Sequence, residues 1–228
     1  MLTVFLAGTD TTSVALSWMF YVLSTDAALQ AECAAEALRL DLDAASEAHI
    51  MSALPALRSL FFECVRFHGA APYLFFELGR LQPGEAVTLA GRRLTHADGD
   101  FTIVALTGFA GKTERAGELG VGSRPHEFDA RRWRTVDGQV RTPADDVIFM
   151  FGSGARVCPG RDVAQLEALV SAVALLQAFS FRLPEGHPKV GSSTKFTQQP
   201  DQDIRLIITA EPVGLTAEPV GFTYPART

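Results

Sequence analysis

Apolar residues recur at helical spacing in four long stretches of the chain, and these stretches predict most of its structure. The first stretch is densely apolar and is interrupted only by the polar run at 8–13. In the third, LPALRSLFFECVRFH places apolar residues at i, i+3, i+4 and i+7, and Gly69 and Pro72 then end the pattern. The four predicted helices span about residues 2–23, 26–40, 54–68 and 161–179.

Shorter apolar runs, each bounded by Gly, Pro or Asp, predict a small antiparallel sheet. The predicted strands lie at about 73–77, 86–89 and 101–106, and residues 196–209 show a further strand-like alternation. The stretch 107–125 is Gly-rich and polar, so we expect an irregular loop there. The predicted fold class is therefore mainly α with a small antiparallel β component, with helices on one side and the sheet on the other.

Composition narrows the class of protein. The chain has 228 residues, of which 47% are hydrophobic and 20% charged, values typical of a soluble globular protein. Its formal net charge of −6 argues against a nucleic acid as partner. The three scattered cysteines, Cys33, Cys64 and Cys158, are too few for a disulfide framework or a four-ligand zinc site. The first residues lack the basic segment of a signal peptide, and no apolar run reaches the ~18 residues of a membrane-spanning helix.

The hexapeptide TAEPVG occurs twice near the C-terminus, at 209–214 and at 216–221. Two copies of a short motif that contains Pro and Gly are too few to build a solenoid. We therefore expect residues 210–228 to form a flexible tail.

The most informative segment is FGSGARVCPG at 151–160. Its glycines let the backbone approach a flat group closely, because they have no Cβ atom. Cys158 precedes the last predicted helix, whose N-terminal amides favour the thiolate form of the sulfur. A thiolate held there suits axial ligation of a haem iron, and Arg156 could pair with a haem propionate. The alternative for a lone cysteine is a small buried hydrophobic residue, which this ten-residue context disfavours.

The same segment matches the pattern F-x-x-G-x-R-x-C-x-G of the cytochrome P450 family at every fixed position. The resemblance implies that Cys158 is the axial ligand of the haem iron. It also implies that Phe151, Gly154, Arg156 and Gly160 belong to the loop that binds the cofactor.

Near the start of the chain, AGTDTT at 7–12 resembles the family's oxygen-activation motif, (A/G)-G-x-(D/E)-T-T. The resemblance implies that Gly8 lets the helix open locally and makes room for dioxygen. The Thr11 hydroxyl would then hydrogen-bond the bound dioxygen, while Asp10 relays protons to it. The alternatives are a Ser/Thr-rich distortion of the helix, or a helix that begins with Asp10 as its N-cap.

Glu63 and Arg66 match the family's E-x-x-R, and their i, i+3 spacing puts them on one helix face. The segment FDARRW at 128–133 resembles the family's F-x-P-E-R-F, whose arginine joins the helical pair. The resemblance implies a structural network of Glu63, Arg66 and Arg132 beneath the haem loop. For Arg131 and Arg134 we expect a solvated basic patch.

The chain departs from the family's pattern at a few positions. Ala130 and Arg131 replace the usual Pro-Glu pair, and Gly69 replaces a common proline. Many members carry a propionate-binding arginine near the position of Phe76, whereas Arg80 is the nearest candidate here.

The motifs follow the family's order over about residues 1–209, so the chain resembles the C-terminal half of a cytochrome P450 from helix I onward, a partial cytochrome P450 fold. The resemblance implies haem b (iron protoporphyrin IX) as cofactor, and insertion of one oxygen atom from O2 into a small, apolar organic substrate. It implies electrons from an NADPH-dependent reductase or a ferredoxin. It also implies the endoplasmic reticulum membrane as location for a eukaryotic member and the cytoplasm for a bacterial one. The alternative is a truncated, catalytically inactive relic or an incomplete gene model that at most binds haem or a partner protein.

Overall fold

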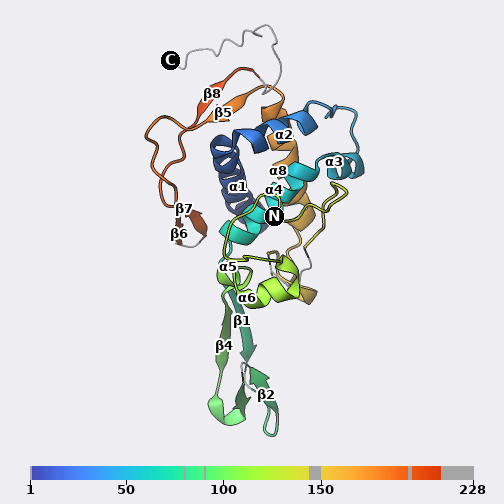
Figure 1. Cartoon of the computed structure of the whole chain (residues 1–228). Helices are drawn as coiled ribbons and strands as arrows, with labels where there is room; N and C mark the ends of the chain where they lie inside the picture. Colours follow the sequence, from blue (N-terminus) through green and yellow to red (C-terminus); the bar gives the residue numbers. More distant parts are fainter. Residues whose placement is uncertain (1, 80, 90, 144–149, 195–196, 212–228) are drawn as a thin grey trace.

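The longer helices gather into one body, from which a narrow arm of strands projects (Figure 1). The computed structural model describes residues 2–79, 81–89, 91–143, 150–194 and 197–211. The helices of the body are α1 (Leu2–Thr25), α2 (Ala27–Ala37), α3 (Glu47–Ala53), α4 (Pro55–His68) and α8 (Arg161–Leu176).

Local signals explain where the helices begin and end. The Asp26 carboxylate accepts a hydrogen bond from Leu29 N at 2.9 Å and so caps the N-terminus of α2. Helix α4 begins at Pro55, whose fixed φ suits a first helical turn. The same helix ends at Gly69, where a Cβ atom would lie only 2.7 Å from the Val65 carbonyl oxygen. A residue with a side chain would therefore have to move the backbone at this point.

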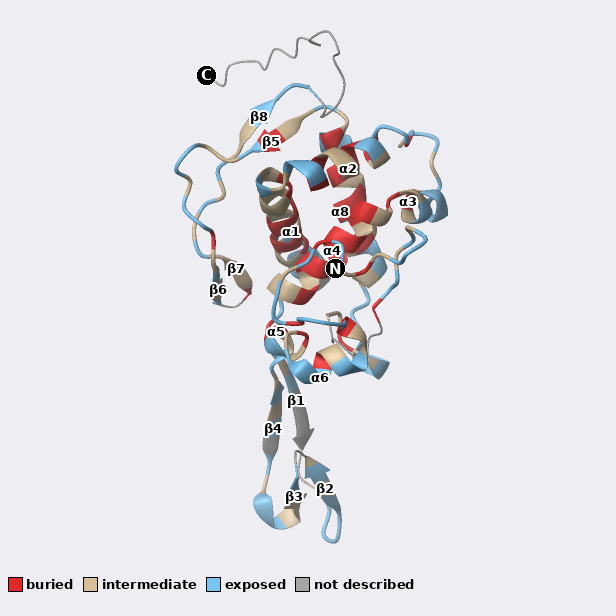
Figure 2. Ribbon diagram, in the orientation of Figure 1, coloured by how far each residue is buried: buried red, intermediate tan, exposed pale blue. Residues whose placement is uncertain are grey.

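The core lies where the buried faces of α1, α2, α4 and α8 meet (Figure 2). Trp18 and Met19 of α1 and Phe61 of α4 are almost completely inaccessible to solvent. Burying an apolar side chain of this size stabilises the fold by about 1.5–3 kcal/mol. The packing also holds α1, which carries AGTDTT, against α8, which follows the Cys158 loop.

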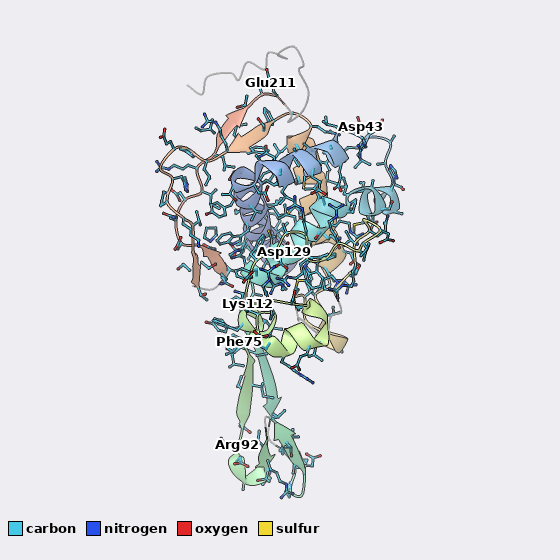
Figure 3. All side chains as sticks on the ribbon, in the orientation of Figure 1. Asp43, Phe75, Arg92, Lys112, Asp129 and Glu211 are labelled. Carbon is cyan, nitrogen blue, oxygen red and sulfur yellow. The ribbon has the colours of Figure 1, made fainter. Side chains whose placement is uncertain are left out.

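The strands in the described residues form separate antiparallel pairs. The pairs are β1 (Leu74–Gly79) with β4 (Phe101–Ala105), β2 (Ala86–Leu89) with β3 (Arg92–Thr95), β5 (Ser180–Arg182) with β8 (Ile207–Thr209), and β6 (Ser192–Thr194) with β7 (Gln198–Pro200). Figure 3 labels Phe75 where the arm leaves the body and Arg92 towards its far end. The arm also contains the short 3-10 helix η1 (His96–Asp98). The β6–β7 hairpin lies beside the body and contacts α1 (Figure 1).

The mainly α fold class with small antiparallel strands is confirmed, as are the four predicted helices. The expectation of an irregular loop at 107–125 is wrong, because this stretch forms α5 (Thr107–Ala110), α6 (Glu114–Ala116) and the π-helical turn η2 (Gly117–Val121). Thr113 Oγ1 accepts a hydrogen bond from Ala116 N at 3.1 Å and so caps α6. The expectation of one small sheet is also wrong, because each strand of the described residues pairs with a single partner.

The predicted flexible tail, 210–228, lies outside the described residues from 212 onward. Within the described ranges, no helix combines the length and the apolarity that crossing a bilayer requires.

Candidate functional site

Cys158 lies in the loop that precedes α8, and it is the exposed one of the chain's three cysteines. The loop contains one turn of 3-10 helix, η3 (Gly154–Arg156). Cys158 N donates a hydrogen bond to Phe151 O at 2.7 Å, and Arg161 N donates one to Cys158 O at 3.3 Å as the chain enters α8. The sulfur is therefore held just before a helix N-terminus, where the helix dipole favours negative charge.

Two glycines of this loop adopt a left-handed backbone conformation, which other residues rarely adopt. The φ angle is 75° at Gly152 and 62° at Gly154. Gly160 differs, because its φ is −93° and a Cβ atom there would lie 3.8 Å from Cys158 Sγ, an ordinary contact. Backbone conformation therefore explains the glycine at position 154 but not the one at position 160. The Arg156 side chain lies outside the described part of the structure, and so does Arg80.

Helix α4 supports the Cys158 loop through an aromatic contact. The rings of Phe61 and Phe151 stack with their centroids 6.3 Å apart and their planes inclined by 19°. Phe61 is buried in the core of the body, whereas Phe151 is half-buried at its edge. Because Phe151 O accepts the Cys158 N–H, this contact helps to position the sulfur relative to the core.

The AGTDTT segment lies within α1, which passes through Gly8 as a continuous helix. The Thr11 hydroxyl donates to the Ala7 carbonyl oxygen at 2.7 Å, a back-bonding geometry that often bends helices. The alternative of a helix that begins at Asp10 is excluded, because α1 begins at Leu2. The expected local opening at Gly8 is not observed.

The surface of α1 near this segment is open. A Cβ atom at Gly8 would have no heavy atom within 4 Å, and the neighbouring Phe5 and Leu6 are exposed. Asp10 is half-buried, and its Oδ1 accepts a hydrogen bond from Gln199 Nε2 at 3.4 Å. Sequence reasoning missed Gln199, because nothing in its local sequence connects it with α1.

Glu63, Arg66 and Arg132, which the sequence predicts to form a network, meet in the structure. Arg66 Nη2 lies 2.6 Å from Glu63 Oε1 and Arg66 Nε lies 2.8 Å from Oε2, a bidentate ion pair between fully buried side chains. Arg132 Nε lies 3.0 Å from Glu63 Oε1. Asp129 N at 2.9 Å and the indole Nε1 of Trp133 at 3.1 Å also donate to this carboxylate, and sequence reasoning missed both. Asp129 is labelled in Figure 3 within the helical body.

The two arginines use their remaining N–H groups on backbone carbonyls. Arg66 Nη1 donates to the carbonyl oxygens of Gly111 and Pro125, each at 2.7 Å. Arg132 Nη1 donates to that of Ser123 at 2.8 Å. The network therefore ties α4 to the segment that was expected to be irregular, and it satisfies carbonyl groups that helices and strands leave free.

Arg131 and Arg134 do not form the expected solvated basic patch. Arg131 Nη2 lies 3.2 Å from Glu32 Oε2, and its Nη1 lies 3.7 Å from Asp26 Oδ2. Arg134 Nη1 binds Glu32 Oε1. The prediction is wrong because the chain passes beside α2, where Glu32 pairs with both arginines and the N-cap residue Asp26 pairs with Arg131.

A family model described as Cytochrome P450 matches residues 1–77 and 123–206, more than half of the chain. The chain belongs to the cytochrome P450 family. Cytochrome P450 1A1 of Canis lupus familiaris is 25% identical to it over 188 residues, which cover 82% of this chain and 33% of the relative. The mitochondrial 25-hydroxyvitamin D-1 alpha hydroxylase of Homo sapiens is 29% identical over 205 residues, which cover 88% of this chain and 37% of the relative.

The fold agrees with the family. The crystal structure of the cytochrome P450DA heme domain superposes with a TM-score of 0.71 at 23% identity, and the match covers 98% of this chain and 46% of that one. The chain thus forms a partial cytochrome P450 fold and spans about a third of the length of the curated relatives it matches. Cytochrome P450 proteins are a family of haem monooxygenases whose haem iron is held by a cysteine thiolate.

The described residues fit a haem that takes one axial ligand from the protein. Among them, no group of three or more His, Cys, Asp or Glu residues could hold a metal ion directly. Cys158 offers an exposed thiol that is in no disulfide. Burial raises the pKa values of the Cys33 and Cys64 thiols, so neither of these residues can present a thiolate at neutral pH. Cys158 is therefore the cysteine whose chemistry suits the cofactor.

Proposed function

We propose that this chain is the haem-binding part of a haem-dependent monooxygenase, with haem b as its cofactor. It inserts one oxygen atom from O2 into a small, apolar organic substrate and receives electrons from an NADPH-dependent reductase or a ferredoxin. The observation that supports this most strongly is the exposed Cys158 sulfur, which follows a left-handed glycine turn and precedes α8. When bound, haem supplies the binding and activation of dioxygen, which protein side chains cannot provide.

The loop residues would hold the sulfur that binds the haem iron. Cys158 Sγ would be the iron ligand, and the hydrogen bond of 2.7 Å from Cys158 N to Phe151 O fixes the backbone of Cys158. Gly154 makes the turn that would carry the chain past the cofactor, and Gly160 ends the loop next to the sulfur. Arg156 would pair with a haem propionate, because its guanidinium is always charged and binds carboxylates well.

Thr11 and Asp10 of α1 deliver protons in this proposal. Thr11 Oγ1 donates its hydrogen to Ala7 O at 2.7 Å, so only its lone pairs are free in this arrangement. To hand on a proton, the hydroxyl must leave the Ala7 carbonyl and receive a proton from Asp10 or from water. Gly8 keeps the helix surface open for dioxygen, since a Cβ atom there would project into space with no other heavy atom within 4 Å.

Glu63, Arg66 and Arg132 have a structural role. They stabilise the segment between α5 and residue 133, and the buried Phe61 on the same helix contacts Phe151. The network therefore acts on the cofactor only through the position of the loop.

The test compares Thr11→Val and Thr11→Ser in the chain loaded with haem. We expect the valine variant to keep the spectrum of the wild-type ferrous-CO complex, but to lose product formation by about 10²- to 10⁴-fold, because proton delivery contributes about that much. The serine variant should retain most of the turnover, since it keeps the hydroxyl. Unchanged, coupled turnover in the valine variant would overturn the assigned role of Thr11. Haem binding by the wild type without any turnover would instead support the catalytically inactive alternative.

A further inference from the structure

The β6–β7 hairpin brings an amide to the Asp10 carboxylate from a distant part of the sequence. Gln199 Nε2 lies 3.4 Å from Asp10 Oδ1 and 2.9 Å from Thr197 Oγ1. An amide nitrogen carries two hydrogens, so it can donate to both oxygens at the same time. Thr197 is buried, whereas Gln199 and Asp10 are half-buried. The buried hydroxyl therefore orients the amide, and the amide in turn meets the carboxylate.

The hairpin is itself fixed to the helical body at several points. These contacts are Gln198 N to Ala70 O at 2.9 Å, His68 Nδ1 to Ser192 Oγ at 3.1 Å, and Val190 N to Tyr21 Oη at 3.2 Å. They join the hairpin both to α1 and to the end of α4. The amide of Gln199 is thus presented to α1 by a braced strand rather than by a free loop.

Within the described residues, Asp10 has no ion-pair partner, since none of the ion pairs found there includes it. The hollow beside the pair is lined by Ser13 and Ser17 of α1 and by Asp201 and Asp203 after β7, with no lysine or arginine. The carboxylate of Asp10 is therefore held by a neutral donor, beside a hollow lined by hydroxyl and carboxylate side chains.

A neutral donor has a specific consequence for a group that passes protons. A lysine or arginine at the same place would stabilise the charged carboxylate and oppose proton uptake. An amide fixes the direction of the carboxylate and perturbs its charge far less. Gln199 thus orients the Asp10 carboxylate without pairing it with a positive charge.

We propose that Gln199 is the positioning residue for Asp10, and that it holds the carboxylate in register with the Thr11 hydroxyl one residue further along α1. The functional part of this inference rests on the proposed function, in which Asp10 relays protons.

The first arm of the test is a double-mutant cycle on the unfolding of the full chain, with Asp10→Ala and Gln199→Leu. We expect the two residues to be coupled by a factor of about three to ten in the unfolding equilibrium constant, because hydrogen bonds to charged groups are stronger than neutral ones but this one is long and partly solvated. Gln202→Leu is the matched control, since Gln202 lines the same hollow but donates to Lys189 O at 2.9 Å. Effects of Gln199→Leu and Asp10→Ala that simply multiply, as with the control, would overturn the proposal.

The second arm follows the fate of oxygen in the chain loaded with haem and reduced by dithionite. Excess dithionite is removed before mixing with air, because it reduces dioxygen directly. One dioxygen then takes up one electron from each of two reduced chains together with two protons and leaves as hydrogen peroxide, whose yield is measured from pH 6 to pH 8. We expect Gln199→Leu to change the yield and its pH dependence in the same direction as Asp10→Ala, and to have no further effect in the Asp10→Ala background. The wild-type ferrous-CO spectrum should be retained throughout.

The two arms separate failure of this inference from failure of the proposed function. If Asp10→Ala changes the peroxide yield and Gln199→Leu does not, Gln199 is not the positioning residue. If neither variant changes the yield although the cycle shows coupling, the contact is real and the relay role of Asp10 is wrong.

Discussion

Replacing Glu63 by Gln tests whether burial makes the Glu63–Arg66 pair the strongest electrostatic contact of the fold. The carboxylate accepts two N–H bonds from Arg66 and one each from Arg132, Asp129 and Trp133. The substitution keeps the shape of the side chain but removes the charge. The amide oxygen can still accept hydrogen bonds, whereas the NH2 group that replaces the other oxygen must face N–H donors. Arg66 then remains buried as a cation without its counter-ion.

The expected loss follows from the burial of the pair. Breaking a fully buried ion pair by removing one partner costs about 3–5 kcal/mol. With a urea m value of roughly 2–3 kcal/mol per M for a chain of this size, the unfolding midpoint should fall by about 1–2.5 M. A loss of this size is a large fraction of the ~5–15 kcal/mol by which folded domains are stable.

The chain contains a matched control for this substitution. Arg115 and Glu118 also form an i, i+3 pair, with Nη1 and Oε2 at 2.7 Å, but their side chains are 73% and 66% exposed. Exposed pairs contribute only about 0–1 kcal/mol, so Glu118→Gln should shift the midpoint by less than about 0.5 M. Equal shifts for Glu63→Gln and Glu118→Gln in urea titrations would refute the argument that burial, and not pairing alone, decides the magnitude.

Three further predictions concern pH and the glycines of the loop. Burial raises the pKa of Glu36 above its ordinary value of 4.5, although N–H bonds from the start of α4 lower it. The stability of the wild type relative to Glu36→Gln should therefore be greatest below pH 4.5 and fall as pH rises through the raised pKa. Urea titrations from pH 4 to pH 7 would check this. Burial, followed by the charges of Lys112 and Arg66, lowers the pKa of His68 to about 3. Between pH 6.5 and pH 5, His68 therefore takes up a proton in the unfolded chain but not in the folded one. The free energy of unfolding should fall by about 2 kcal/mol over this range, and His68→Gln should not show this loss. Gly154→Ala should lower stability by about 1–2 kcal/mol because its φ is 62°, whereas Gly160→Ala should change thermal unfolding little; equal effects would contradict the conformational argument.

The sequence predicts the long helices well because their apolar periodicity extends over many residues. Helix α4 shows this, since its apolar positions predict which side is buried and Gly69 predicts where the helix ends. The seven-residue α3 cannot be predicted in this way, because a helix of two turns has too little periodicity. It depends instead on its N-cap residue Ser46, whose Oγ accepts a hydrogen bond from His49 N at 3.3 Å. Short helices of this kind are stabilised by their surroundings.

The site residues divide in the same way. Cys158, Glu63 and Arg132 can be predicted because they stand in short motifs whose spacing is visible along the chain. The Trp133 contact cannot, because the pattern F-x-P-E-R-F has at its position a phenylalanine, which has no side-chain N–H to donate to Glu63. Gln199 cannot, because its partner Asp10 lies 189 positions away in the sequence. Contacts at such separations depend on how the helices and the β6–β7 hairpin pack, which local patterns do not encode.

The proposed function requires this chain to build a haem site with a cysteine thiolate from Cys158. The most direct test is the difference spectrum between the ferrous and the ferrous-CO states of the purified chain reconstituted with haem, recorded for the wild type, Cys158→Ala and Cys33→Ala. We expect a strongly red-shifted Soret band in the wild type and in Cys33→Ala, and its loss in Cys158→Ala. A wild type without the red-shifted band, or a band that survives Cys158→Ala, would contradict the account.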